Sequence, residues 1–333
     1  MTSPELSIVV LSWNTRELTK RCLHSLRSDG TALTREVIVV DNGSRDGSAD
    51  MVERDFPEVI LIRNTENRLY AAGNNQGAWR ATGEWLCLLN SDTEVKPGAL
   101  DRCVEFLREH SDYGIVAPQL LNFDGTPQRA VMRFPTLLTP LLDSTRLGTF
   151  FPGKQLADRQ RMSDFDHAHS LDVDQPPAAV WVLSRKEYGE LNGLDETLSL
   201  FFNDVDFCMR LRQRGRRIRF LAEAGVFHHQ GASTRSLADR NRNSLWYRNR
   251  QTFYTKHWGR IGRGWLRFVL RLWALQVSAG TRLGPRTKEQ KRVALAELRE
   301  HVVACLGEGD DSVGPNEART AAIPEQRPVG GVE

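Results

Sequence analysis

Short apolar runs alternate with segments of helical spacing through the first half of the chain. Residues 6–12 and 36–41 are nearly continuous, β-branched apolar runs of the kind found in buried parallel strands. Between them, residues 15–27 carry apolar side chains at the spacing of one helix face. The pattern therefore predicts a β-α-β unit at the start of the chain.

The alternation continues further along the chain. It predicts strands at 59–62 and 85–89 and helices at 71–81 and 97–109. Strands that alternate with helices indicate an α/β fold with a mostly parallel, doubly wound central sheet.

The second half of the chain has a weaker pattern. Residues 152–177, rich in Asp, Gln, His and Pro, predict a long surface loop. Beyond it, the sequence predicts a strand at 178–184, a helix at 204–214, strands at 218–221 and 226–229, helices over 245–305 and a disordered tail from about 307.

The composition is that of an ordinary globular protein, with 40% hydrophobic and 26% charged residues in 333. The five cysteines are scattered and form no Cys-x-x-Cys pair, so neither a disulfide framework nor a zinc cluster is indicated. No signal peptide and no apolar run of bilayer length is found. These features predict a cytoplasmic protein.

Charge is distributed unevenly along the chain. Residues 1–234 carry 27 basic and 32 acidic side chains, residues 235–299 carry 16 and 3, and the last 34 residues carry 2 and 7. The basic segment indicates an anionic partner or surface, unless it is only a solubilising face.

Polar side chains follow the expected strands at the sheet edge where ligands bind in such folds. Asp41 ends a strand beside a Gly-bearing turn, where it can accept hydrogen bonds from a base or ribose or can simply form the turn. Asn90 and Asp92 follow another strand, and their oxygens suit Mg²⁺ or Mn²⁺ bound to a diphosphate. The alternative is a turn capped by Ser91 or Asp92.

Two further candidates lie in the second half. Asp204 and Asp206 begin an expected helix, where the helix dipole favours acids without any function, although a general base would look the same. His228 and His229 end an expected strand, and such histidines are more often hydrogen-bonded core residues than ligands.

Six motifs stand in a characteristic order: residues 8–14, 40–44, 67–77, 89–92, 203–206 and 228–233. In this order they resemble the motifs of family 2 glycosyltransferases, and most strongly the rhamnosyltransferase-like branch. The resemblance covers roughly residues 5–260. It implies a GT-A fold, a nucleotide-diphosphate-sugar donor such as dTDP-rhamnose, a divalent metal and inversion at the anomeric carbon. The implied acceptor is a glycan or lipid-linked hydroxyl in cell-envelope polysaccharide synthesis.

With this resemblance we expect a GT-A catalytic domain at 1–240, with a nucleotide-sugar-binding half to about residue 120 and an acceptor half at 121–240. A basic amphipathic helical extension follows at 241–306, and a disordered tail at 307–333.

The resemblance also implies roles for single residues. Asp204 is the expected catalytic base, and Asp92 and His228 are the expected ligands of Mg²⁺ or Mn²⁺. Asp41 is expected to read the base, and the other residues expected at the donor nucleotide are Ser12, Trp13, Asn14, Asn75, Asn90 and Ser91. Candidate accessory residues are Asn203, Asp206 and His229.

Three positions depart from the family pattern. Asn90 replaces the first acid of the Asp-x-Asp motif and leaves less negative charge on the ion. Asn203 stands where an acid often precedes the base. Leu69 occupies a place usually held by glycine, so we expect the backbone path to differ there.

The basic segment contains an amphipathic pattern. It places arginines on one side and apolar side chains on another, namely Arg260, Arg263, Arg267 and Arg271 against Trp265, Phe268, Val269, Leu272 and Trp273. Two interpretations stay open: a helix on the anionic inner face of the cell membrane, or a helix packed on the catalytic domain. No recognition motif indicates nucleic acid.

Other classes of protein remain as alternatives. A nucleotidyltransferase usually carries a Gly-rich phosphate loop after the first strand, and a dinucleotide-dependent oxidoreductase carries Gly-x-Gly-x-x-Gly there; residues 12–15 match neither. In a non-catalytic glycan-binding module, Asp92, Asp204 and His228 would not need to converge, whereas an enzyme requires them around one cleft.

Overall fold

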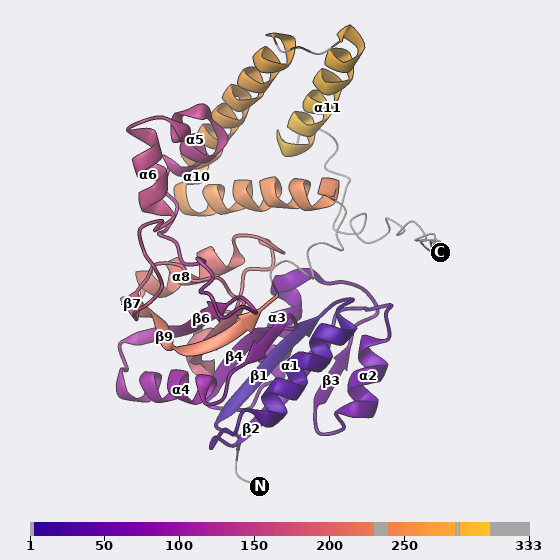
Figure 1. Cartoon of the computed structure of the whole chain (residues 1–333), viewed down its shortest axis with the longest axis vertical. Coiled ribbons are helices and arrows are strands. Elements are labelled where there is room, and N and C mark those ends of the chain that lie inside the picture. The colour runs from indigo at the N-terminus through magenta and orange to yellow at the C-terminus, as the bar shows by residue number, and fades with distance from the viewer. Residues whose placement is uncertain (1–2, 230–238, 284, 286, 307–333) are drawn as a thin grey trace.

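The computed structural model describes residues 3–229, 239–283, 285 and 287–306 (Figure 1). The strands are β1 (Leu6–Ser12), β2 (Arg35–Asp41), β3 (Ile60–Arg63), β4 (Trp85–Asn90), β5 (Thr93–Val95), β6 (Tyr113–Leu121), β7 (Leu171–Asp172), β8 (Val180–Ser184) and β9 (Arg217–His228). The helices are α1 (Arg16–Ser28), α2 (Ser48–Asp55), α3 (Leu69–Arg80), α4 (Ala99–Glu109), α5 (Thr139–Ser144), the 3₁₀ helix η1 (Arg146–Thr149), α6 (Gly153–Gln160), α7 (Arg185–Glu190), α8 (Asn203–Gln213), α10 (Asp239–Leu283) and α11 (Lys288–Leu306). The expected tail and residues 230–233 of the last motif lie outside the described residues.

The strands form one mixed sheet in the order β3-β2-β1-β4-β8-β6-β9-β5, with β7 beside β9. In the described part of the chain, β3, β2, β1, β4, β6 and β9 run in one direction, and β5, β7 and β8 run in the other. The expectation of a mostly parallel α/β sheet is confirmed.

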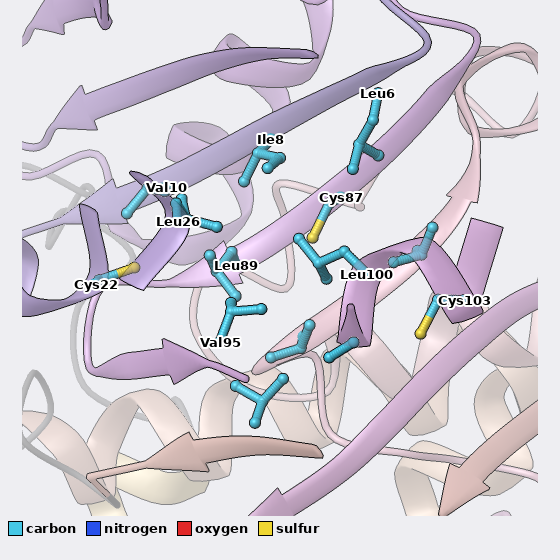
Figure 2. Packing of buried hydrophobic residues seen from close by; sticks show 14 of the residues in the cluster. Leu6, Ile8, Val10, Cys22, Leu26, Cys87, Leu89, Val95, Leu100 and Cys103 are labelled. Carbon is cyan, nitrogen blue, oxygen red and sulfur yellow. The ribbon is translucent and has the colours of Figure 1, made fainter. Parts of the chain in front are cut away.

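Side chains that alternate along the strands build a core on each face of the sheet. Leu6 and Ile8 of β1 pack on one face with α1, α2 and α4, and Val9 packs on the other face with α3, α7 and α8. Figure 2 shows the first core, where Cys22 of α1 and Leu100 of α4 meet the strands. Burial of these apolar side chains fixes both helical layers against the sheet.

Helix α3 approaches the sheet closely because Gly77 has no side chain. A Cβ at this position would lie 2.3 Å from Cγ1 of Val9, so any larger residue would push the helix outward. The approach sets the position of the loop that enters α3.

The C-terminal helices leave the sheet region. Gly259 has φ 60° and ψ −150°, so α10 consists of two helices joined at this residue. In Figure 1 the part before Gly259 crosses beside the sheet domain, and the part after it starts beside α5 and α6 and runs away from the sheet, with α11 alongside. The helices expected over 245–305 are present, with a break at Gly259.

Two expectations for the second half are wrong. The loop expected at 152–177 contains α6 and β7; α6 buries only Ala157, so it has no apolar stripe that a sequence pattern can show. The two strands expected at 218–221 and 226–229 are one strand, β9, whose pairing with β6 shifts register between Pro118 and Gln119.

Two expectations from composition, on the cysteines and on membrane-spanning helices, can be compared with the described residues. Cys22, Cys87, Cys103 and Cys208 are buried free thiols. None of the described helices has the length and apolar character needed to cross a bilayer.

Candidate active site

The loops after β1 and β2 are joined at the carboxyl edge of the sheet. Ser12 pairs with Asp41 in the parallel register, and Asn42 N donates to Ser12 O at 2.8 Å. Asn14 N donates to Ser44 Oγ at 2.9 Å, while Asn14 Oδ1 accepts from the amide of the residue after Ser44 at 2.8 Å. Trp13 and Asn14 are both half-buried, so their side chains border this edge.

Asp41 carries a carboxylate oxygen without a partner. Its side chain is buried, and Oδ2 accepts from Ser44 N at 3.1 Å, whereas Oδ1 has no hydrogen-bond partner. A buried acceptor left unpaired costs about 1–3 kcal/mol. A donor group on a bound base or ribose would satisfy it, which agrees with the predicted role of Asp41.

Ser12 and Ser91 instead use their hydroxyls inside the fold. Ser12 Oγ lies 2.8 Å from Thr19 Oγ1, and Ser91 Oγ lies 2.9 Å from Thr15 Oγ1. Both serines are buried, so these hydroxyls tie α1 to the strand ends. Asn90 N donates to Ala179 O at 2.8 Å, which ties the end of β4 to the segment before β8.

The amide of Asn75 has no hydrogen-bonding position left for a nucleotide. Its Oδ1 accepts from Tyr188 OH at 2.6 Å and Leu194 N at 2.9 Å, and its Nδ2 donates to Leu194 O at 2.8 Å and Glu196 Oε1 at 3.0 Å. An amide offers two donors and two acceptor lone pairs, and all four are used. The structure therefore corrects the predicted donor contact: Asn75 holds the loop that leads to α8.

Asp92 and His228 meet across two strands. His228 ends β9 and lies opposite Thr93 of β5, and His229 N donates to Asp92 O at 2.8 Å. The pairing brings His228 Nε2 to 3.5 Å from Asp92 Oδ1, an oxygen that is buried and has no hydrogen-bond partner. Two side chains 136 positions apart in the sequence thus point at one place.

Gln128 fixes the orientation of the His228 ring. Its Nε2 donates to His228 O at 2.7 Å, which turns its Oε1 towards the ring, where Nδ1 donates to it at 2.9 Å. In the neutral imidazole this leaves the lone pair on Nε2, the atom that faces Asp92. No sequence motif pointed to Gln128.

The donor set suits a divalent cation that also binds substrate. Among the described residues no group of three or more His, Cys, Asp and Glu side chains is arranged to hold a metal alone. The unpaired Asp92 Oδ1 and the His228 Nε2 lone pair are nevertheless two ligands directed at one point. Ions such as Mg²⁺ and Mn²⁺ are commonly held by one or two protein side chains with substrate phosphates and water, so the residues present fit.

Asp204 lies in the first turn of α8 and remains partly exposed. Burial raises the pKa of its carboxyl above the usual range, against hydrogen bonds from the backbone N–H groups of Val205 and Ala178, which lower it. Val205 N donates to Asp204 Oδ1 at 2.8 Å. Phe202, just before the helix, has φ 64°, a strained conformation for a bulky residue and of a kind that clusters at functional sites.

Tyr70 connects the acids of the two halves. Its hydroxyl donates to Ala178 O, next to the residue that receives Asn90 N. Burial raises the pKa of the Tyr70 phenol well above its usual value, and the negative charges of Asp204 and Asp92 raise it further. The predicted base and the predicted metal ligand thus both act electrostatically on one tyrosine. Tyr70 lies inside the 67–77 motif but was not singled out.

Leu69 adopts the backbone conformation that favours glycine. Its φ is 64°, and the turn is held by Leu69 N donating to Asn67 Oδ1 at 2.8 Å and by Asn42 Nδ2 donating to Leu69 O at 3.2 Å. A left-handed conformation costs an L-residue about 1–2 kcal/mol. The leucine therefore holds a conformation that a glycine would adopt freely, at this cost.

Asp206, a candidate accessory residue, is fully buried in a charge cluster. Its Oδ1 lies 2.9 Å from His257 Nε2 and 2.8 Å from Lys256 Nζ, and its Oδ2 accepts from Arg210 Nε at 2.7 Å. Burial by itself raises the pKa of Asp206, but the His257 hydrogen bond and the charges of Arg210 and Lys256 outweigh it and lower the pKa to about 2. Asp206 joins α8 to α10 and does not face Asp92.

The other accessory candidates also have partners in the fold. Asn203 is buried, and its Nδ2 donates to Leu198 O at 3.0 Å. His229 Nε2 lies 3.5 Å from Glu94 Oε1, beside the ring of Phe123. Neither side chain is shown to point at the Asp92 and His228 pair.

The sheet order, the polar edge and the acids around Tyr70 define a GT-A fold. The solved structure of mannosyltransferase PcManGT from Pyrobaculum calidifontis, in complex with GDP-Man and Mn²⁺, matches 92% of this chain and 87% of its own chain, with a TM-score of 0.50 and 15% identity. Residues 7–170 match the profile described as Glycosyl transferase family 2. These residues form a family 2 glycosyltransferase domain.

Two relatives cover most of the chain. The N-acetylglucosaminyl-diphospho-decaprenol L-rhamnosyltransferase of Mycobacterium tuberculosis (strain CDC 1551 / Oshkosh) is 24% identical over 242 residues, which is 69% of this chain and 77% of that protein. The low-salt glycan biosynthesis hexosyltransferase Agl10 of Haloferax volcanii is 26% identical over 250 residues, or 74% of each chain. The predicted membership of family 2 with a rhamnosyltransferase-like relative is confirmed.

Proposed function

We propose that this glycosyltransferase moves a sugar, with L-rhamnose favoured, from a nucleotide-diphosphate sugar to a hydroxyl of a glycan or lipid-linked acceptor in cell-envelope polysaccharide synthesis. The observation that carries the proposal is the approach of His228 Nε2 to the unpaired Asp92 Oδ1, and the charges of Asp92 and Asp204 both acting on Tyr70 support it. The named rhamnosyltransferase among the relatives supports the choice of sugar.

The proposed reaction is a single displacement with inversion. The acceptor oxygen forms a bond to the anomeric carbon, the bond from that carbon to the diphosphate oxygen breaks, and the acceptor proton passes to the carboxylate of Asp204. The raised pKa of Asp204 suits this role, because a base accepts a proton more readily as its pKa approaches the working pH.

Four further side chains would hold the donor. Asp41 Oδ1 would accept from the base or ribose, and the half-buried Trp13 would border it. Asp92 and His228 would hold Mg²⁺ or Mn²⁺, which when bound neutralises negative charge on the departing diphosphate. Asn90 has an amide where the Asp-x-Asp motif has its first acid, so the site carries less negative charge around the ion.

The alternatives have less support. Membership of a glycosyltransferase family argues against a nucleotidyltransferase. A non-catalytic module would need no grouping of Asp92, Asp204 and His228, and the contact of Asp92 with His228 argues for the enzyme.

A donor panel tests the proposal. The full chain is incubated with dTDP-rhamnose, UDP-, GDP- and other dTDP-sugars, each with Mg²⁺, Mn²⁺ or EDTA, and a lipid extract as acceptor. We expect one donor class to release nucleoside diphosphate and to label the acceptor with the inverted anomer. Release from no donor, or a product with retained configuration, would overturn the proposal.

A further inference from the structure

The second part of α10 presents two separate apolar faces. Leu266, Val269 and Leu270 are buried. By contrast, Ile261, Phe268 and Leu275 are 76%, 54% and 67% exposed, and their spacing of seven residues lines them up along the opposite side of the helix. The sequence pattern had placed Phe268 and Val269 on one face, and the structure separates them.

A neighbouring segment extends this exposed row. Leu147, Phe150 and Phe151, between α5 and α6, are 51%, 65% and 78% exposed. Arg146 N donates to Gln276 Oε1 at 3.4 Å, which ties this segment to α10.

A second hydrogen bond, from Trp265 Nε1 to Leu137 O, ties the residues just before α5 to the same helix. We call the exposed residues the apolar patch; it consists of Leu147, Phe150, Phe151, Ile261, Phe268 and Leu275. In Figure 1 the α5, α6 and α10 segments that carry it gather at the end of the molecule opposite β2 and β3.

The helix that carries half of the apolar patch is strongly basic. Residues 260–283 include five arginines and no acidic residue. Arg260, Arg263, Arg271 and Arg282 are exposed. An exposed apolar row flanked by arginines is the pattern of a helix lying in a bilayer interface, with apolar side chains at the acyl boundary and cations at lipid phosphates.

We propose that the apolar patch docks on a membrane surface that contains anionic lipids. Charge decides between this occupant and a second copy of the chain, because two copies joined through the patch would bring their acid-free arginine helices together. The face that packs inside the protein is already filled by Leu266, Val269 and Leu270. Docking is independent of the proposed sugar transfer, and it would bring the catalytic half to a lipid-linked acceptor.

Vesicle co-sedimentation of the full chain tests the docking without donor or acceptor. Vesicles of neutral phosphatidylcholine are compared with vesicles that also contain phosphatidylglycerol, at low and high salt. The variants are Phe150→Ser/Phe151→Ser and Arg260→Glu/Arg282→Glu. The matched controls are Phe123→Ser, an exposed phenylalanine away from the apolar patch, and Arg21→Glu/Arg80→Glu, exposed arginines of α1 and α3 with the same change of charge.

We expect the full chain to bind only the vesicles that contain phosphatidylglycerol, and we expect this binding to be weaker at high salt. Arg260→Glu/Arg282→Glu should bind at least about tenfold more weakly, since each basic residue near an anionic surface contributes about fivefold. Phe150→Ser/Phe151→Ser should bind at least about tenfold more weakly too, because it removes two large apolar side chains from the acyl boundary. The controls should bind like the wild type, and circular dichroism checks that each variant is folded.

Equal binding by folded test variants, or binding to neither vesicle, would overturn the docking. So would a dimer that Phe150→Ser/Phe151→Ser converts to a monomer while vesicle binding stays absent. Sugar transfer in detergent reports separately on the proposed function, so the two can fail independently.

Discussion

Asp206 of α8 and His257 of α10 are joined by a buried contact, with His257 Nε2 2.9 Å from Asp206 Oδ1. Lys256 extends the connection, because its Nζ lies 2.8 Å from the same oxygen and also contacts Asp195 in the loop before α8. Helix α8, which carries Asp204 in its first turn, is therefore anchored to α10. The basic extension is packed on the catalytic half through its first part.

Replacing Asp206 by Asn should lower the free energy of unfolding by about 3 kcal/mol, because it removes the buried carboxylate that Arg210 of α8 and Lys256 of α10 both contact. Urea unfolding measures the change. Asp164→Asn, an exposed aspartate, is the control and should stay within about 0.5 kcal/mol. A change that small in Asp206→Asn would contradict the anchoring role.

The same cluster predicts how stability changes with pH. The folded pKa of Asp206 is about 2, below its unfolded value, so its ionisation stabilises the fold above pH about 4 and the contribution is lost as pH falls towards 2. The lowering corresponds to about 2 kcal/mol. Unfolding free energies at steps between pH 5 and 2 should therefore fall more steeply in the wild type than in Asp206→Asn, and parallel profiles would contradict the assignment.

Asp204→Asn should reduce sugar transfer by about 10²- to 10⁴-fold while donor binding stays nearly intact, because the amide cannot take the acceptor proton. Initial rates and donor titration measure the two effects separately, with Asp164→Asn again as the control. If Asp204→Asn turned over as fast as the wild type, Asp204 would not be the catalytic base.

The pH profile gives an independent measure of this base. Because burial raises the pKa of Asp204, kcat/KM should begin to fall at a higher pH than an ordinary aspartate would give, as protonation inactivates the base. The residual rate of Asp204→Asn should lack that acidic limb. A limb that persists unchanged in Asp204→Asn would belong to another group.

Strand ends and first helical turns were predictable from the sequence because their apolar patterns are local. The contact of Asp92 with His228 was predictable only as a resemblance, since it depends on β5 and β9 pairing across a long separation in sequence. The structural roles of Asn75, which holds the loop before α8, and of Gln128, which orients the His228 ring, were not predictable. A side-chain amide uses the same atoms whether it binds a loop, a ring or a ligand. Nor does periodicity reveal which of Phe268 and Val269 is covered, since their neighbours come from other segments.

Asp92→Ala should weaken nucleotide-diphosphate binding measured with Mn²⁺ and leave the much weaker binding in EDTA unchanged. Gln128→Leu should reduce the metal-dependent affinity by about 10- to 100-fold, because it releases the His228 ring without removing a ligand. Calorimetric titration with and without metal separates these effects. Unchanged affinity in Asp92→Ala, together with activity that EDTA does not affect, would exclude the metal assignment.

Leu69→Gly should be more stable than Leu69→Ala by about 1 kcal/mol, the reverse of the usual order. Alanine keeps the cost of the left-handed φ of 64°, whereas glycine adopts it freely, and both lose the same side-chain packing beyond Cβ. Leu18 in α1 is the control: its backbone is helical, so Leu18→Gly should be less stable than Leu18→Ala by about 1 kcal/mol. Thermal and urea unfolding of the four variants gives both differences. If Leu69→Gly proved less stable than Leu69→Ala, the turn before Tyr70 would not carry the strain that its backbone angle indicates.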